Sequence, residues 1–198
     1  MRDTKSSSNN SRSNNDWSVR ALYEWMMHPP VAGNAATVLL RLMAGGVFLS
    51  EGILKFVYTN QGVGRFTKLG FPWPHATATF VGGLEIVGGL CLLAGLLTRF
   101  TAVIFIVEMI VAILTTKISL YLGTSPLPLP PAPPRIGFWA VMHETRSDWA
   151  QLLTVSFLLL AGPGRWSLDA WLGRAWWAAR PKQATWELDR AAQVGSGW

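Results

Sequence analysis

Apolar residues form three long runs, separated by short polar or proline-rich segments. These runs cover residues 35–58, 76–97 and 100–122. Each exceeds the ~20 residues that a helix needs to cross the hydrocarbon core of a bilayer. Because only Thr98 and Arg99 separate the second run from the third, we expect these two runs to form a tight helical hairpin. The pattern predicts three membrane-spanning helices in this part of the chain.

A fourth apolar run near the C-terminal end is shorter. Residues 149–161 are apolar over a length that alone is typical of a buried or re-entrant segment. A helix that begins near Glu144 and covers residues 144–161 approaches crossing length. We therefore predict a fourth crossing, and an all-α fold in which four transmembrane helices form a bundle.

The two ends of the chain differ from this apolar centre. Residues 1–34 begin with a Ser/Asn-rich stretch that we expect to be disordered, followed by a short interfacial helix over residues 16–28. Residues 164–198 form a Trp-rich tail in which apolar side chains recur at helical spacing. This spacing predicts an amphipathic helix that lies in the headgroup plane of the membrane. A soluble helix packed on a partner protein is the alternative. The stripe consists of Leu168, Trp171, Leu172, Ala175, Trp176 and Ala179.

Composition supports a membrane protein. Hydrophobic residues make up 50% of the 198 residues, and charged residues only 14%, where an ordinary soluble domain has about 25% charged residues. The formal net charge of +6 could indicate nucleic-acid binding. On a membrane protein, however, basic residues usually report orientation and lipid contact. We therefore expect the lipid bilayer as a partner and no nucleic acid.

The distribution of Lys and Arg predicts the orientation. Basic residues are concentrated in the N-terminal tail, the turn at residues 98–99 and the C-terminal tail, whereas the two long loops at 59–75 and 123–148 contain few. Four crossings place both tails on the same side of the membrane, and the positive-inside rule assigns that side to the cytoplasm. The expected location is the plasma (inner) membrane, with both termini cytoplasmic.

Ionisable residues within the predicted spans are the main functional signal. A charge at the bilayer centre costs on the order of 3 kcal/mol on insertion scales, so these side chains should face protein or water and find partners. They indicate either a polar site for a small molecule or electrostatic contacts that fix helix register. The six residues are Arg41, Glu51, Lys55, Glu85, Glu108 and Lys117.

Depth along the helices predicts an inner ion pair. At ~1.5 Å per residue, Arg41 and Glu108 lie about 9 and 12 Å above the cytoplasmic ends of their helices. Since these depths are similar and the charges opposite, we expect Arg41 and Glu108 to pair.

The same argument predicts an outer cluster. Lys55 and Lys117 lie near the outer ends of their helices, and Glu51 lies about 10 Å below the end of its own. We expect these three side chains to meet. Glu85 lies near mid-depth, and it either joins one of the two groups or stays protonated.

Glycines flank the charges on the first two predicted helices. Small residues allow helix backbones to approach closely in lipid, so packing is the favoured interpretation. The expected packing positions are Gly45, Gly46, Gly82, Gly83, Gly88 and Gly89.

The sequence offers few residues that could bind a metal or a haem or act in catalysis. Cys91 is the single cysteine, and His28, His75 and His143 all lie outside the predicted spans. We therefore expect no metal site, no intramembrane haem and no catalytic residue of a self-sufficient enzyme. In the outer loop, Arg65, Phe71 and Trp73 could cap the mouth of a site in the bundle; an aromatic belt at the interface is the alternative.

Residues 38–122 and 156–172 resemble the DoxX family of small four-helix membrane proteins. The matching pieces are LLRLMAGGVFLSEGILKF, RFTKLGFPWP, VGGLEIVGGLCLLAGLLTRFTA and GPGRWSLDAWL. The resemblance implies a DoxX-like transmembrane domain over residues 35–163 and a link to quinone-dependent oxidoreductase systems. It points to the polar positions within the matched stretches, which are Arg41, Glu51, Lys55, Glu85 and Arg99.

The leading hypothesis is an accessory membrane subunit of a quinone-linked oxidoreductase system, for which quinone is a candidate cofactor. Soluble or membrane oxidoreductase subunits would be its partners, and a homo-oligomer is a further option. A small transporter or proton-coupled carrier is one alternative, because it could use the same charges. A non-catalytic scaffold for soluble redox enzymes is another.

Overall fold

The computed structural model describes residues 19, 21–22, 25–26 and 34–179. Within these residues every regular element is a helix, which confirms the all-α prediction. The predicted disorder of residues 1–15 and the part of the Trp-rich tail after residue 179 lie outside the described residues. Of the predicted helix over residues 16–28, the described positions Val19, Ala21, Leu22, Trp25 and Met26 are helical.

Three helices are long and apolar enough to cross a membrane. They are α2 (Thr37–Val57), α4 (Pro74–Ala94) and the segment Thr98–Leu122, which contains α5 (Thr98–Thr116) and the short α6 (Ser119–Leu122). These helices correspond to the three long apolar runs of the sequence. The chain is therefore a membrane protein with several apolar helices.

The predicted fourth crossing is a shorter helix. α8 (Arg146–Ala161) has 16 residues, fewer than the ~20 that span the hydrocarbon. It directly follows α7 (Phe138–Glu144), with Thr145 between them. The Thr145 hydroxyl donates a hydrogen bond to the Val141 carbonyl, and the Trp149 amide donates to the Thr145 carbonyl at 2.8 Å. Hydrogen bonds of Thr145 therefore connect α7 to α8.

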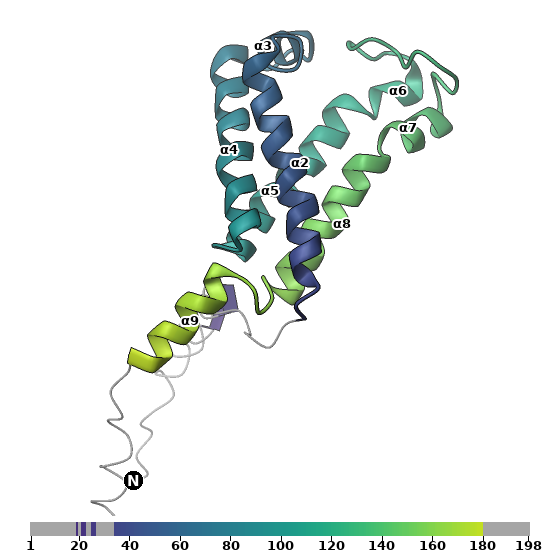
Figure 1. The fold of residues 1–198 in the computed structure, drawn as a ribbon. Helices are drawn as coiled ribbons and strands as arrows, with labels where there is room; N and C mark the ends of the chain where they lie inside the picture. The colour runs from purple at the N-terminus through teal and green to yellow at the C-terminus, as the bar shows by residue number, and fades with distance from the viewer. Residues whose placement is uncertain (1–18, 20, 23–24, 27–33, 180–198) are drawn as a thin grey trace, which may run out of the picture.

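The helices pack as two pairs that separate toward one end. α2 packs along α4, and α5 packs along α8, with a smaller contact between α2 and α8. The short α3 (Val63–Lys68) covers α4 near the end at which α6 and α7 also lie (Figure 1). α9 (Leu168–Ala179) lies at the opposite end, beside the turn between α4 and α5.

A compact apolar cluster holds the two pairs together. The rings of Phe48 on α2 and Phe105 on α5 stack with their centroids 3.7 Å apart and their planes 8° from parallel. Leu92 of α4 and Val155 and Leu158 of α8 are fully buried in the same cluster. All four long helices contribute to it, so this cluster fixes their relative register.

Glycines on α2 and α4 bring these two helices into direct backbone contact. A Cβ atom added at Gly45 would lie 2.8 Å from the Gly89 carbonyl oxygen, and one added at Gly52 would lie 2.8 Å from that of Gly82. Gly88 instead faces the Phe105 ring on α5. Gly46 and Gly83 have nothing within 4 Å of an added Cβ, so these two glycines are not at a close helix contact.

Candidate functional site

A cavity of about 820 Å³ lies between the two helix pairs, on the side of the Phe48–Phe105 stack that faces α3. This volume is within the range of small-molecule sites in proteins. Aliphatic and aromatic side chains make up most of its lining, and ionisable side chains lie among them. The apolar lining includes Phe48, Leu54, Phe80, Leu84, Val107 and Met109.

The inner end of the cavity holds a buried ion pair. The Lys55 ammonium lies 2.7 Å from Oε1 and 2.5 Å from Oε2 of Glu85. The Glu85 side chain is 4% exposed and that of Lys55 13%, so little water reaches either group. Lys55 and Glu85 come from α2 and α4, and their pairing satisfies two charges whose unpaired burial in a membrane would be costly.

Glu108 of α5 joins this pair. Its carboxyl group lies beside the Glu85 carboxyl group. Glu108 Oε2 is buried and has no hydrogen-bond partner among the described residues. We call Lys55, Glu85 and Glu108 the inner triad. With all three groups ionised, the inner triad contains one positive and two negative charges.

The predicted outer cluster does not form, because Glu51, Lys55 and Lys117 do not form ion pairs with one another. Lys55 pairs with Glu85 and Lys117 pairs elsewhere, while Glu51 lines the cavity as an exposed side chain. The error comes from helix register. An added Cβ at Gly82 would lie 3.4 Å from the Lys55 Cβ, so the last turn of α2 lies about two turns inside the start of α4. Depth counted from helix ends therefore placed Lys55 too far out.

The predicted inner pair of Arg41 and Glu108 does not form. Arg41 lies about 10 Å below Phe48 on α2, and Glu108 lies about 4.5 Å above Phe105 on α5. Since Phe48 and Phe105 are stacked at the same level, the two charges are about 15 Å apart in depth. Arg41 is 2% exposed and donates a 2.6 Å hydrogen bond to the Trp166 carbonyl oxygen.

Arg41 belongs to a junction between the α4–α5 turn and the start of α9. The Asp169 carboxylate accepts hydrogen bonds from the Leu97 amide at 2.8 Å and the Thr98 amide at 3.1 Å, so it caps α5. The Asp169 amide donates to the Gly95 carbonyl at 2.9 Å. Gly95 has φ +68°, and an added Cβ would collide with the Arg41 guanidinium. We call Arg41, Gly95 and Asp169 the turn–tail junction.

Arg99 has a separate structural position at the same end. It is 2% exposed and donates hydrogen bonds to the carbonyl oxygens of Leu160, at 3.2 Å, and Trp25. Its guanidinium carbon lies 4.0 Å from the centroid of the Trp25 ring, a cation–π contact. Arg99 therefore connects the start of α5 to the end of α8 and to the segment before α2, and it does not line the cavity.

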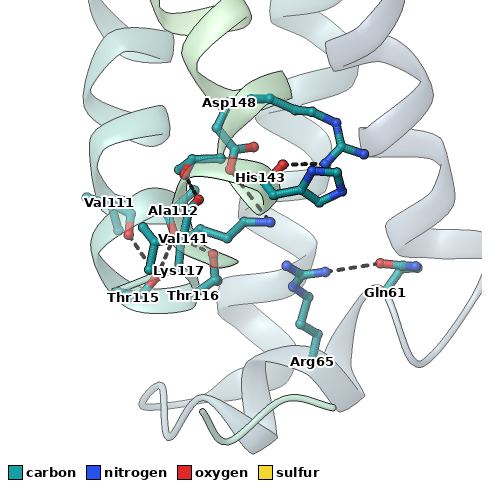
Figure 2. A network of polar contacts seen from close by, with 12 residues as sticks. Gln61, Arg65, Val111, Ala112, Thr115, Thr116, Lys117, Val141, His143 and Asp148 are labelled. Atoms are coloured by element: carbon teal, nitrogen blue, oxygen red, sulfur yellow. Dashed lines mark hydrogen bonds and ion pairs between the residues drawn. The ribbon is translucent and has the colours of Figure 1, made fainter. Parts of the chain in front are cut away.

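The outer end of the cavity contains a second polar group. The Lys117 ammonium lies 3.7 Å from the Asp148 carboxylate, and Arg65 donates a 3.4 Å hydrogen bond to Gln61 (Figure 2). All four residues line the cavity. Asp148 and Gln61 were not predicted from the sequence. The signal for Asp148 was its place in the first turn of α8, where a carboxylate can face the end of α5.

Of the two aromatic residues predicted to cap the mouth, one lies at the cavity. Phe71 lines it and packs edge-on against Phe66, with ring centroids 5.3 Å apart. Trp73 does not line it and is 82% exposed, so the capping prediction is wrong for Trp73. Among the described residues, no three His, Cys, Asp or Glu side chains are grouped to hold a metal ion.

Long apolar helices around buried ion pairs define a multi-span helical membrane protein. Comparison with known sequences gives its family. The DoxX family model matches residues 36–118. The chain belongs to the DoxX family, as the resemblance predicted.

Two relatives extend the match beyond the family model. The chain is 42% identical over 148 residues to "Uncharacterized membrane protein Rv3486" of Mycobacterium tuberculosis, which covers 72% of this chain and 84% of the relative. It is 33% identical over 133 residues to "Putative oxidoreductase CatD" of Bacillus subtilis, covering 67% of this chain and 84% of that protein. No solved structure matches the chain.

Proposed function

We propose that this DoxX-family protein is an accessory membrane subunit of an oxidoreductase system that holds a quinone in the cavity between its helix pairs. The observation that carries the proposal is the cavity itself: about 820 Å³, lined mostly by apolar side chains, with the Lys55–Glu85 pair and Glu108 at its inner end. A quinone has matching chemistry, with an apolar ring and tail and polar atoms on the ring. When bound, it would transfer electrons and protons between partner proteins.

The walls of the cavity support access from the bilayer. Phe80 of α4 and Val107 of α5 line the cavity, yet they are 69% and 57% exposed. α4 and α5 also share few contacts beyond their connecting turn. A lipid-soluble ligand could therefore enter between α4 and α5 without passing through water.

The closed inner end favours binding over passage through the bundle. The Phe48–Phe105 stack and the close contact of Gly45 with Gly89 lie directly beneath the cavity. A carrier would need a polar route past the Phe48–Phe105 stack. Arg41 lies on one side of this stack and Glu108 on the other, so these two residues do not form an ion pair that could provide the route. The name of the Bacillus subtilis relative also supports a redox context over transport.

The proposed membrane arrangement has four crossings, with α7 and α8 together forming the fourth. The supporting observations are the near-continuity of α7 and α8 and the packing of α8 along α5. Both termini would be cytoplasmic in the plasma membrane, with α9 in the headgroup plane. Leu168, Trp171 and Leu172 of α9 are exposed, as an interfacial helix requires.

Cysteine labelling tests this arrangement. In a Cys91→Ser background, Thr124→Cys and Arg174→Cys each introduce one exposed thiol, at opposite ends of the bundle. A membrane-impermeant maleimide added to intact cells should label the variant at position 124. It should label the one at position 174 only after lysis. Labelling of both variants in intact cells would contradict the orientation.

Quinone binding tests the proposed function. Purified protein in nanodiscs should bind decylubiquinone or its reduced form saturably. Glu85→Gln should weaken binding at least tenfold, and Val107→Trp should weaken it by narrowing the cavity while leaving the ion pair in place. Glu144→Gln, a carboxyl outside the cavity lining, is the matched control. If neither form of the quinone binds the wild-type protein, the proposal is wrong.

A further inference from the structure

The inner triad contains more acceptors of hydrogen bonds than donors. An ionised carboxylate only accepts hydrogen bonds, whereas an ammonium only donates them. The single ammonium of Lys55 lies between both oxygens of Glu85, at 2.5 and 2.7 Å, so two of its three donors are used there, and none reaches Glu108 Oε2. Glu108 brings two further carboxyl oxygens, and a proton shared with Glu85 would leave one of them as an acceptor only.

One of these oxygens is buried without a partner. Glu108 Oε2 has no hydrogen bond from any described residue, and almost none of its surface is exposed. Buried polar atoms in proteins nearly always have a partner, because leaving one unsatisfied is costly. Since Glu108 lines the cavity, a bound molecule can supply the missing donor.

The outer end of the cavity has a mixed character. The donors Arg65 and Lys117 line it beside the carboxylate of Asp148 and the amide of Gln61. A ring with polar atoms on opposite sides can therefore find a donor or an acceptor at the outer end, whereas Glu108 Oε2 at the inner end needs a donor. A ligand with a hydroxyl or another donor group can satisfy Glu108.

We propose that the inner end of the cavity selects the reduced, dihydroxy form of the quinone over the oxidised form, with Glu108 accepting the hydrogen bond of a ring hydroxyl. This inference rests on the proposed function and adds the redox state of the ligand. The oxidised form has two carbonyl oxygens and no donor, so its carbonyl would face the carboxylate oxygen of Glu108. The reduced form places a hydroxyl at the same point and satisfies that oxygen.

Competitive binding of the two forms tests this inference. Dissociation constants for decylubiquinol and decylubiquinone, which share the same tail, are measured by calorimetry on the full-length protein in nanodiscs without oxygen. A hydrogen bond to a charged acceptor corresponds to about tenfold or more in affinity. We therefore expect decylubiquinol to bind at least about tenfold more tightly than decylubiquinone.

Substitution of Glu108 separates the inference from its alternatives. Glu108→Gln keeps the shape of the side chain and adds a donor, so it should reduce the preference for decylubiquinol below about threefold. Glu144→Gln should leave the preference unchanged. If the wild-type protein binds both forms equally, or the oxidised form more tightly, this inference is overturned while the proposed function stands. If neither form binds, both are overturned.

Discussion

The Lys55–Glu85 pair places one charge of each sign at a depth where water is scarce. The contact distances of 2.5 and 2.7 Å and the low exposure of both side chains make it the most strongly constrained polar contact of the cavity. In low-dielectric surroundings, removing one partner leaves the other charge buried without a counter-charge. This destabilises the protein more than removing both partners does. The two residues should therefore behave as a unit.

Lys55→Met should lower the free energy of unfolding by about 3 kcal/mol, because Glu85 would remain buried without its counter-charge. The double variant Lys55→Met/Glu85→Gln should recover part of that loss. Reversible unfolding in mixed micelles measures both values. Lys117→Met is the comparison, since the Lys117–Asp148 distance is 3.7 Å; it should cost under about 1 kcal/mol. Equal effects of the two single substitutions would contradict the difference in contact distance between the two pairs.

The sequence predicted which residues carry the buried charges, but not how they pair. Hydropathy placed Glu85 and Lys55 within spans. Glu85 pairs with Lys55, a member of the predicted outer cluster, although that cluster does not form. The pairing depends on the relative shift of the helices along the membrane normal. That shift is defined by the Gly45–Gly89 and Gly52–Gly82 contacts of α2 with α4, and by the Phe48–Phe105 stack between α2 and α5. Neither feature can be read from a single sequence.

At the scale of the helices, the α2–α4 contact depends on glycines spaced seven residues apart. Gly45 meets Gly89, and Gly52 meets Gly82. Because lipid tails are as apolar as the helix side chains, the hydrophobic effect does not drive helices together in a membrane. Close backbone contact of this kind therefore supplies much of the packing energy. The sequence pattern identified three of these four glycines. It missed Gly52, because the other glycines occur as adjacent pairs in the sequence and Gly52 does not.

Gly52→Ala should destabilise the protein by about 1–3 kcal/mol, because the added methyl would meet the Gly82 backbone at 2.8 Å. Gly46→Ala, on the same helix, should be neutral or stabilising by up to about 1 kcal/mol. Thermal unfolding of the two variants in the same detergent gives the comparison. A Gly46→Ala variant as unstable as Gly52→Ala would show that the effect does not come from the contact.

The Asp169 carboxylate of α9 caps the start of α5. Asp169→Ala removes the acceptor for the Leu97 and Thr98 amides and should cost about 1–2 kcal/mol. Amide hydrogen exchange should then become faster at residues 95–99 and 168–172. Arg174→Gln, an exposed change on the same helix, should leave exchange at the turn unchanged. Unaltered protection in Asp169→Ala would argue against the turn–tail junction.

At the scale of the whole molecule, composition and periodicity were sufficient for the class of protein. Long apolar runs must be helical in lipid, because every backbone polar group needs an internal partner there. This is why the all-α fold and the three spans could be predicted. The cavity could not be, because it arises from the separation of two helix pairs, and that separation is a property of packing. The residues that line it come from five helices and the loops between them.

The central claim is that the charged interior is a ligand site between the helix pairs. Photo-cross-linking with an azido-quinone, followed by peptide mass spectrometry, tests it most directly. The account predicts labels near Phe48, Leu84 and Val107, and their suppression by excess decylubiquinone. Labels confined to the outward side chains Leu90 and Leu114, or labels that the competitor leaves unchanged, would contradict it.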